Sequence, residues 1–435
     1  MMREGVEVHL DDLDGSGSRD GSFSLKTALI QTFLPIGYPA SVKAEYLDYQ
    51  VWDSLQALSS YIRGVLSSRF VFQGLGVGDD TATGLGAALA WVYKDGVGIV
   101  SSLLFAYKYT PYFDAYPSSF RLVADTLCNL GLLLNMSVGV LPSSYFIVIT
   151  SLSSICFGCL GIAAGATKSK ISSHLAEGGH LGDLMAKEST QESAVTLLGM
   201  LCGVAITSVI GESLALSWVV FFLCTLFHQY ANYRLVKVLQ FNTLNNQRLW
   251  LLSEQLHEHH LSAQGVPLPT PSDLAHRESL FSFPLWLSLY GPAIGKSVTH
   301  ALHALPLSSG RQVSWEGKWS EVFRREDGSC PFVVDVERQR QGEGESRTER
   351  RVVVLLSRDC DEEAKAEACL VAYAWHQALH EGPVRREESR LRRLVSEARS
   401  LIARLRQGEA GWTLEGVCLA GDRRFRYFDA GAKSQ

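Results

Sequence analysis

The residues with the most unusual chemistry in this sequence are ionisable side chains that lie in or beside long apolar stretches. They are Asp79, Asp80, Lys94, Asp95, Asp125 and Glu212. A charge inside a lipid bilayer is costly, so such residues usually face the interior of a helical bundle and line a path for an ion or a polar solute. We therefore expect Lys94 to pair with Asp125 or Asp79 inside a bundle. The competing interpretation is that these side chains lie at the membrane interface and stay hydrated.

A glycine-rich segment offers a second candidate site. Gly74, Gly76 and Gly78 alternate with apolar residues and lead into Asp79 and Asp80. Such a loop could hold a phosphate group, but its spacing does not match a dinucleotide-binding fingerprint, and no Lys-Ser or Lys-Thr pair follows it as in a P-loop. The favoured interpretation is a glycine-rich helix break in or beside a membrane.

The cysteine and histidine motifs are weak signals for metal or catalytic chemistry. Cys156 and Cys159 have C-x-x-C spacing but lie in the most apolar stretch, where buried free thiols are expected. His257, His259 and His260 lack a cysteine or carboxylate partner at zinc-ligand spacing. No recognisable catalytic constellation is present. We therefore expect no metal, no cofactor and no catalytic residue, and we predict that the protein is not an enzyme.

The overall composition argues against two classes of protein. The 435 residues carry a formal net charge of −5, and no basic stripe with interleaved aromatic residues is present, so nucleic acid is not an expected partner. The number of cysteines, 9, is odd, and most of them lie in apolar segments. This usage is typical of reduced thiols rather than of a secreted disulfide scaffold. The acidic, polar start of the chain does not have the pattern of a signal peptide.

The elements that must position these residues are predicted to be mainly α-helical, as a multi-pass helical membrane region followed by a small cytosolic α+β domain. The clearest span is 145–166, which contains no charged residue and no histidine. About 20 apolar residues in a helix cross a bilayer. The expected units are a disordered acidic tail at 1–24, a helical, glycine-rich core at 25–110, membrane-spanning helices within 111–235, a helix and proline-rich linker at 236–310, and an α+β domain at 311–435. The four expected spans are 121–141, 145–166, 194–210 and 213–230.

Two segments before these spans need a separate interpretation. Apolar residues recur at three- and four-residue spacing over 45–71, which predicts an amphipathic helix. The stretch 85–107 is long enough to cross a membrane, but a central Lys94-Asp95 pair would be costly in lipid. We therefore expect two half-helices there, which dip into the membrane or pack on the bundle.

The distribution of basic residues supports the predicted spans. If all four stretches cross a membrane, alternate connections fall on one side, and the other side holds no lysine or arginine. The basic side holds Lys108, Arg121, Lys168, Lys170, Lys187, Arg234 and Lys237. Since cytoplasmic loops are enriched in these residues, both termini are predicted to be cytosolic. The alternative is a large soluble helical domain, which would have no reason to sort its basic residues in this way.

The C-terminal part alternates between strand and helix patterns. We expect strands within 311–330, 331–336 and 351–357, helices at 361–379 and 387–405, and a hairpin over 412–428 that turns at Gly421-Asp422.

Several short motifs occur together in one order along the chain. They are Gly37-Tyr38-Pro39, the run from Tyr46 to Gln56, Gly74 to Asp79, Trp91 with Lys94-Asp95-Gly96, Arg121 to Asp125, Ala186 to Glu192, and Thr243 to Arg248. Together they closely resemble the Root UVB Sensitive family. In the family's Ala-Lys…Ser-Gln-Glu run, this chain has Lys187, Gln191 and Glu192, with Thr190 at the serine place. The resemblance covers about 30–430 and is strongest before 250.

The resemblance implies a multi-pass membrane or membrane-associated protein and looks closest to an animal-type member. For plant members it implies roles in seedling responses to weak UV-B light, in auxin transport and in vitamin B6 balance, with two members acting as a complex. The family offers no agreed catalytic residues, so none are carried over to this chain.

Three hypotheses for the function follow. The leading one is a non-enzymatic scaffold or adaptor in a membrane complex, whose partners are membrane lipids and a second copy or another family member. The second is a small-solute transporter or channel-like protein that uses Asp79, Lys94, Asp95 and Asp125 as a polar path. The third is a binder of a phosphorylated small molecule, such as a vitamin B6 form, at the loop 74–80.

Overall fold

The computed structural model describes residues 25–75, 84–259, 267–280, 320–323, 325, 332–340, 348–357, 361–380, 387–418 and 426–428. Four of the expected site residues, Gly76, Gly78, Asp79 and Asp80, lie outside these ranges, as does the expected tail at 1–24. Across the described residues the protein is mainly helical, as expected.

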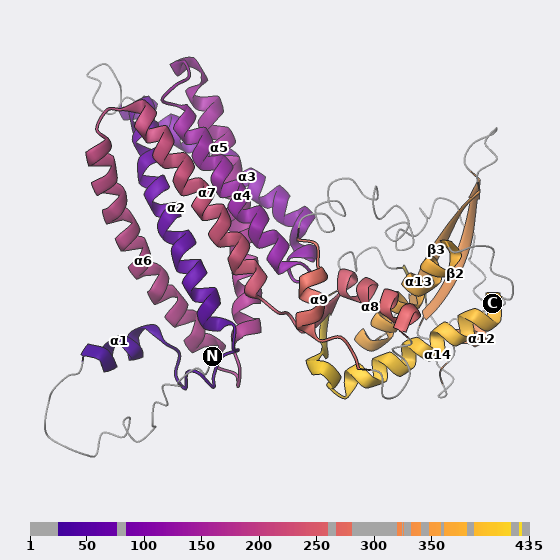
Figure 1. Cartoon of the computed structure of the whole chain (residues 1–435). Coiled ribbons are helices and arrows are strands. Elements are labelled where there is room, and N and C mark those ends of the chain that lie inside the picture. The colour runs from indigo at the N-terminus through magenta and orange to yellow at the C-terminus, as the bar shows by residue number, and fades with distance from the viewer. Residues whose placement is uncertain are drawn as a thin grey trace, which may run out of the picture.

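Six long helices form an up-and-down bundle (Figure 1). They are α2 (Tyr46–Gly74), α3 (Gly84–Phe113), α4 (Pro117–Ser137), α5 (Phe146–Leu175), α6 (Leu181–Ile210) and α7 (Leu214–Val238). The helices α2, α4 and α7 contact one another in the middle, α6 packs on α2, α5 packs on α4, and α3 packs on α5. We call the end at which α2, α4 and α6 begin the base, and the opposite end the far end.

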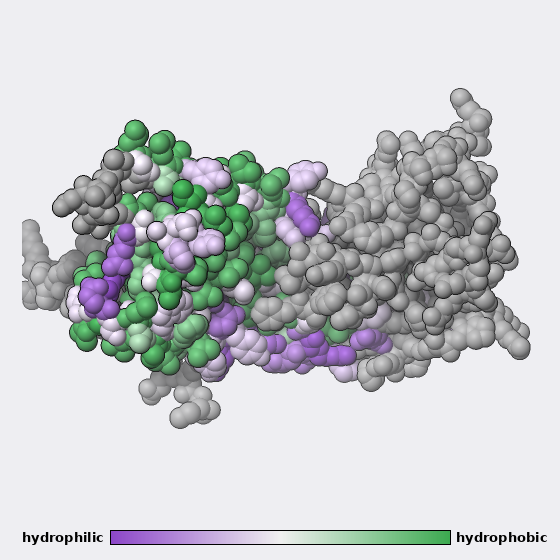
Figure 2. Space-filling model, turned by 90° about the horizontal axis from the view of Figure 1, so that it is seen from above, coloured by the Kyte–Doolittle hydropathy of each residue, from purple (hydrophilic) through white to green (hydrophobic). Residues whose placement is uncertain are grey.

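Within the described residues, four helices are long and apolar enough to cross a membrane, judged by length and composition. They are 84–110 in α3, 143–175 covering the short helix η2 (Ser143–Tyr145) and α5, and the whole of α6 and α7. Their outer surfaces are apolar: Figure 2 shows hydrophobic residues over most of the coloured face of the bundle. Three of the four expected spans lie in these helices, and each helix is longer than the span that we expected in it.

The structure corrects two expectations for the first half of the bundle. The segment 85–107 is not two half-helices, because α3 is one continuous helix. The Lys94-Asp95 pair was the argument against a span, but the two side chains neutralise each other, since Lys94 Nζ lies 2.7 Å from Asp95 Oδ1. The expected span at 121–141 lies mostly in α4, which is not among the four apolar helices. Arg121 and Asp125 lower the hydropathy of α4, and both are buried.

Helix α2 turns an unexpected face toward the centre of the bundle. Its expected amphipathic pattern predicted an apolar buried stripe. The most buried side chains instead include several polar ones, namely Gln50, Gln56, Ser59, Arg63 and Ser67. The buried face of α2 therefore combines polar side chains with apolar ones such as Leu66 and Phe70.

The remaining elements lie at the base. Helix α1 (Leu25–Phe33) packs beside α6, and the C-terminal elements follow α7 (Figure 1). These are β1 (Thr243–Asn245), α8 (Asn246–His259), α9 (Pro271–Arg277), α12 (Ser320–Phe323), β2 (Phe332–Arg340), β3 (Thr348–Ser357), α13 (Glu362–His380), α14 (Glu387–Arg406), η3 (Glu409–Gly411), β4 (Thr413–Cys418) and β5 (Arg426–Phe428).

Two sheets organise the described C-terminal residues, and the structure there differs from two expectations. Strands β4 and β5 do not form a hairpin, because β4 pairs in parallel with β1 and β5 pairs in parallel with β3. Of the range 311–330, the structure describes only the short helix α12 and Arg325, so the strand expected there lies outside the described residues. The segment expected as a linker contributes to the core, since Leu244, Leu252 and Leu274 are buried against α13 and α14.

Candidate functional site

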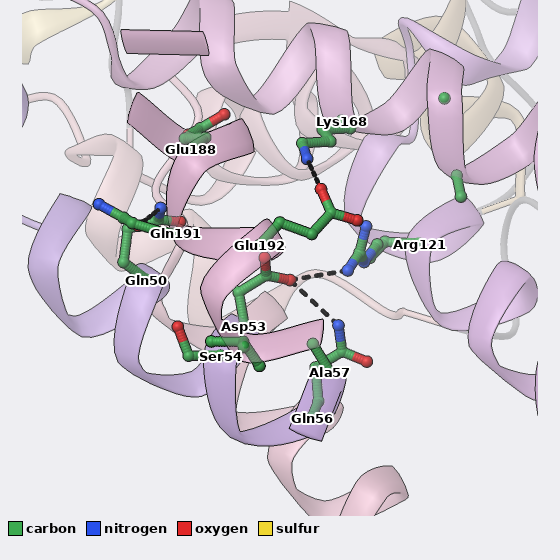
Figure 3. A pocket seen from close by; sticks show the side chains of 13 residues that line it. Gln50, Asp53, Ser54, Gln56, Ala57, Arg121, Lys168, Glu188, Gln191 and Glu192 are labelled. Atoms are coloured by element: carbon green, nitrogen blue, oxygen red, sulfur yellow. Dashed lines mark hydrogen bonds and ion pairs between the residues drawn. The ribbon is translucent and has the colours of Figure 1, made fainter. Parts of the chain in front are cut away.

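A polar pocket of about 280 Å³ lies near the base of the bundle. Helices α2, α4, α5 and α6 enclose it (Figure 3). Its polar lining consists of Gln50, Asp53, Ser54, Gln56, Arg121, Lys168, Glu188, Gln191 and Glu192. Its volume corresponds to roughly nine water molecules at about 30 Å³ each, so it suits a small solute.

An ion pair between α2 and α4 forms one wall of the pocket. Arg121 Nη2 donates to Asp53 Oδ1 over 2.7 Å, and the Gln56 amide donates to the same oxygen over 3.2 Å (Figure 3). Arg121 Nε also lies 3.4 Å from Asp125 Oδ2, one helical turn along α4. The single guanidinium group therefore connects the pocket to the interior of the bundle.

Helices α5 and α6 supply the opposite wall. Lys168 Nζ lies 2.5 Å from Glu192 Oε2, and the Gln50 amide donates to Gln191 Oε1 (Figure 3). Gln191 also donates to the carbonyl of Phe33, at the end of α1. These contacts hold α2, α5 and α6 in register around the pocket.

One carboxyl oxygen of the pocket is not used by the protein. Glu188 Oε2 accepts a hydrogen bond of 2.6 Å from Ser172 Oγ, whereas the buried Glu188 Oε1 has no hydrogen-bond partner. A buried acceptor without a donor is costly, by about 1–3 kcal/mol. This oxygen has no access to solvent, so a ligand nitrogen in the pocket could donate to it only after the Glu188 side chain turned.

The charges of the pocket are mixed. Its lining contains the carboxylates Asp53, Glu188 and Glu192 and the cations Arg121 and Lys168. Such a lining can bind the two ends of a zwitterion. It suits a strongly charged ion of one sign less well, because each cation already has a carboxylate neighbour.

The expected site residues are distributed over three places. Asp125 lies just inside the pocket wall and is buried, so the interpretation that it is hydrated is wrong. Lys94 pairs with Asp95 and not with Asp125, and it lies 3.8 Å from the centre of the Trp91 ring. It lines a separate cavity of about 120 Å³ toward the far end. Asp79 and Asp80 lie outside the described residues.

The family-motif residues also lie in different parts of the bundle. Gln191 and Glu192 line the pocket, whereas Lys187 donates from its ammonium group to the carbonyl of Gln31 and fastens α1 to α6. Gly74 lies at the far end, where a Cβ atom would be 2.5 Å from the Phe146 ring. Close packing therefore explains this glycine, and Gly76 and Gly78 lie outside the described residues.

Sequence reasoning missed most of the lining. Gln50, Asp53 and Ser54 were visible as polar residues at i, i+3 and i+4 on the first turns of α2, which would have indicated a polar helix face. Glu188 is a single carboxylate four residues before Glu192. Neither pattern indicates the partners on α4 and α5, which lie 68 residues away for Asp53 and Arg121 and 16 residues away for Glu188 and Ser172.

A second polar cluster closes the base beside the pocket. Lys43 Nζ donates to His174 Nδ1 over 2.9 Å, so His174 Nε2 carries the proton and donates to Glu45 Oε1 over 3.0 Å. Burial lowers the pKa of Lys43, although Glu45 and Glu177 oppose that shift. Burial raises the pKa of Glu45, but the hydrogen bond from His174, a backbone hydrogen bond and the charges of His174 and Lys43 together outweigh burial, and the net pKa is lowered. These contacts join the start of α2 to the end of α5.

Among the described residues, no group of three or more histidine, cysteine, aspartate or glutamate side chains could hold a metal ion. The six described cysteines that are free include Cys156 and Cys159, both buried in α5.

Comparison with known proteins identifies relatives over the bundle. The family model described as the vitamin B6 photo-protection and homoeostasis domain matches residues 19–260. RUS family member 1 of Dictyostelium discoideum is 36% identical over 254 residues, which are 58% of this chain and 47% of that protein. Protein root UVB sensitive 3 of Arabidopsis thaliana is 34% identical over 258 residues, 59% of this chain and 57% of that protein.

The matched region therefore spans about half the length of these relatives. No solved structure is significantly similar to the chain. The family model covers more than half of the 435 residues, including all six bundle helices and every residue that lines the pocket. This chain belongs to the Root UVB Sensitive family.

Proposed function

We propose that this protein is an integral membrane protein whose helical bundle binds a small zwitterionic solute in the base pocket and moves it across the membrane. The observation that carries the proposal is the contrast between the inside and the outside of the bundle. A pocket lined by five charged side chains lies among helices whose outer faces are apolar. Membrane transporters commonly place charged residues facing the bundle interior, where they mark the solute path.

A vitamin B6 form is the first solute to test, because the family model carries the name of that vitamin. Pyridoxal phosphate has a basic ring nitrogen and an anionic phosphate group. The nitrogen suits the free Glu188 oxygen, and the phosphate suits Lys168 and Arg121. This proposal moves the expected B6 site from the loop 74–80 to the base of the bundle.

The test is uptake of pyridoxal phosphate and pyridoxal into vesicles that contain the purified protein. Lys168→Gln removes a cation from the pocket, and we expect it to reduce pyridoxal phosphate uptake severalfold. The matched control is Arg69→Gln, which removes a cation from α2 toward the far end, where Arg69 pairs with the exposed Glu212. Release of the protein from membranes by carbonate, or equal uptake by the two variants, would contradict the proposal.

A scaffold function is a second candidate, favoured by a different feature. A groove of about 720 Å³ between α2 and α6 is lined largely by apolar side chains, which include Val65, Phe72, Met200 and Val204. Such a groove suits a helix of a second family member or of another copy. Cross-linking through this groove in the absence of any uptake would favour the scaffold over the transporter.

A further inference from the structure

Asp125 on α4 and His228 on α7 face each other in the interior of the bundle. Their side chains are 9% and 0% exposed, and His228 Nε2 lies 3.7 Å from Asp125 Oδ1. Neither His228 Nε2 nor Asp125 Oδ2 has a hydrogen-bond partner. The pocket residue Arg121 is the link between this pair and the solute site.

The hydrogen bonds of His228 determine which of its nitrogens carries a proton. Nδ1 lies 3.0 Å from the carbonyl oxygen of Gln56, which can only accept. Nδ1 must therefore donate, and Nε2 of a neutral imidazole has a lone pair. An ionised Asp125 would then place one acceptor opposite another. One added proton resolves this conflict, either on the carboxyl group or on the imidazole.

The other titratable and charged groups around the pair come from several helices. Helix α2 contributes Tyr49, Asp53 and Arg63, and α4 contributes Arg121 and Cys128. Helix α6 places Glu188 near Arg121, and Lys168 of α5 is paired with Glu192. The two buried guanidinium groups favour an ionised Asp125, whereas exclusion of water favours a neutral one. These two effects oppose each other, and one proton on either group removes the conflict between the two acceptors.

We propose that Asp125 and His228 share one exchangeable proton and that this buried site couples proton binding to solute binding through Arg121. The coupling rests on the proposed function, whereas the existence of the proton site does not. The step is the uptake of one proton from water by the pair, with no other bond made or broken. Protonation neutralises Asp125, so Arg121 loses one ion-pair partner and keeps Asp53. The pocket then attracts an anionic group of the solute more strongly.

Infrared difference spectra of the purified protein, recorded across a pH titration, test the proton site. A buried protonated carboxyl group has a carbonyl stretch separate from the amide bands. We expect one such band to titrate in the unaltered protein, to be lost in Asp125→Asn, and to titrate at a different pH in His228→Gln. Glu188→Gln is the matched control, because Glu188 is the other buried carboxyl group beside Arg121. A band that survives Asp125→Asn, or no titrating band at all, would overturn the proposal.

The coupling is tested by measuring the affinity for pyridoxal phosphate at each pH. Above the titration of the pair, the protonated fraction falls tenfold per pH unit, so the affinity is expected to fall by about tenfold per unit. Asp125→Asn mimics the neutral carboxyl group, so its affinity should not fall with pH in this way. Comparing the two proteins at the same pH cancels the effect of the probe's own titration. Equal slopes in both proteins would refute the coupling. If the probe binds at no pH, the proposed function fails, and the infrared result alone decides whether the proton site exists.

Discussion

Arg63 is a cation in the interior of the bundle. It is fully buried in the middle of α2. Its guanidinium group donates to the carbonyl of Ser59, to Asn129 Oδ1 on α4 and to Thr225 Oγ1 on α7. Asn129 continues the network by donating to Gln229 over 2.8 Å. A single cation therefore connects the three central helices by polar contacts.

Replacing Arg63 alone should destabilise the protein. In Arg63→Leu the half-buried Asn129 oxygen loses its donor, which costs about 1–3 kcal/mol at most. Thermal unfolding in detergent measures the change. The double variant Arg63→Leu with Asn129→Leu removes both partners and should recover part of the loss. In the control Arg69→Leu, the partner Glu212 is 90% exposed and stays hydrated, so little change is expected. A double variant less stable than the sum of the two single changes would contradict this account.

The residue patterns of the sequence predict charges in a bundle, but not their partners. The local sequence places Arg121 and Asp125 one turn apart on one helix, and this proximity is present in the structure. The pairing of Lys94 depended on which helices are neighbours, and the expected partner Asp125 was wrong, whereas the alternative, Asp79, lies outside the described residues. Helix α3 contacts mainly α5, so Lys94 reaches Asp95 and the Trp91 ring instead of α4. Which helices are neighbours is a property of the tertiary structure, and the spacing of residues along one helix does not indicate it.

At the scale of elements, the position of α3 depends on glycines. Helix α3 packs mainly against α5, and the backbones come closest where Gly98 faces Ser154 and Gly158. A Cβ atom on Gly98 would lie 2.9 Å from the carbonyl oxygen of Ser154, and one on Gly158 would meet the carbonyl oxygen of Gly98. Backbone atoms cannot rotate away as a side chain can. The absence of side chains at these positions therefore lets α3 pack closely on the bundle.

We expect Gly158→Ala to displace α3 and to destabilise the protein by about 1–3 kcal/mol, the usual range for an overpacked contact. Gly161→Ala on the same helix is the matched control, since no atom lies within 4 Å of its added Cβ. Alanine favours a helix over glycine by about 1 kcal/mol, so the control should be neutral or more stable. Thermal unfolding and protease cleavage of α3 compare the two variants. Equal effects of both changes would show that α3 does not depend on this contact.

The sequence predicts some helices and strands of this fold well, but it does not predict how the strands pair. The uncharged run at 145–166 corresponds to α5, and the strand patterns before and after the segment 341–347 correspond to β2 and β3. The last two strands were predicted at nearly the correct residues but with the wrong pairing. Strand β4 adds to β1, which lies about 170 residues earlier, and only the folded chain brings them together. Local alternation of residues predicts a strand and not its neighbour.

At the scale of the whole molecule, an even number of helices returns the chain to the end at which it entered. The chain enters α2 and leaves α7 at the base. The C-terminal elements contact the turn between α3 and α4 at the same end, because the Asn245 amide donates a hydrogen bond to the carbonyl of Ala115. The basic residues at the base include Lys43, Lys168, Lys187 and Lys237. Since cytoplasmic segments of membrane proteins are enriched in basic residues, we expect the base to face the cytosol.

Single cysteines at the two ends of the bundle test this orientation. Glu177 lies exposed between α5 and α6 at the base, and Glu212 lies exposed between α6 and α7 at the far end. A membrane-impermeant maleimide applied to intact sealed cytosolic-side-out vesicles should label Glu177→Cys and not Glu212→Cys. Adding detergent should expose both, and labelling of the unaltered chain provides the background to subtract. Because α6 alone separates the two positions, equal labelling in sealed vesicles would show that α6 does not cross the membrane, and the transport proposal would fall with it.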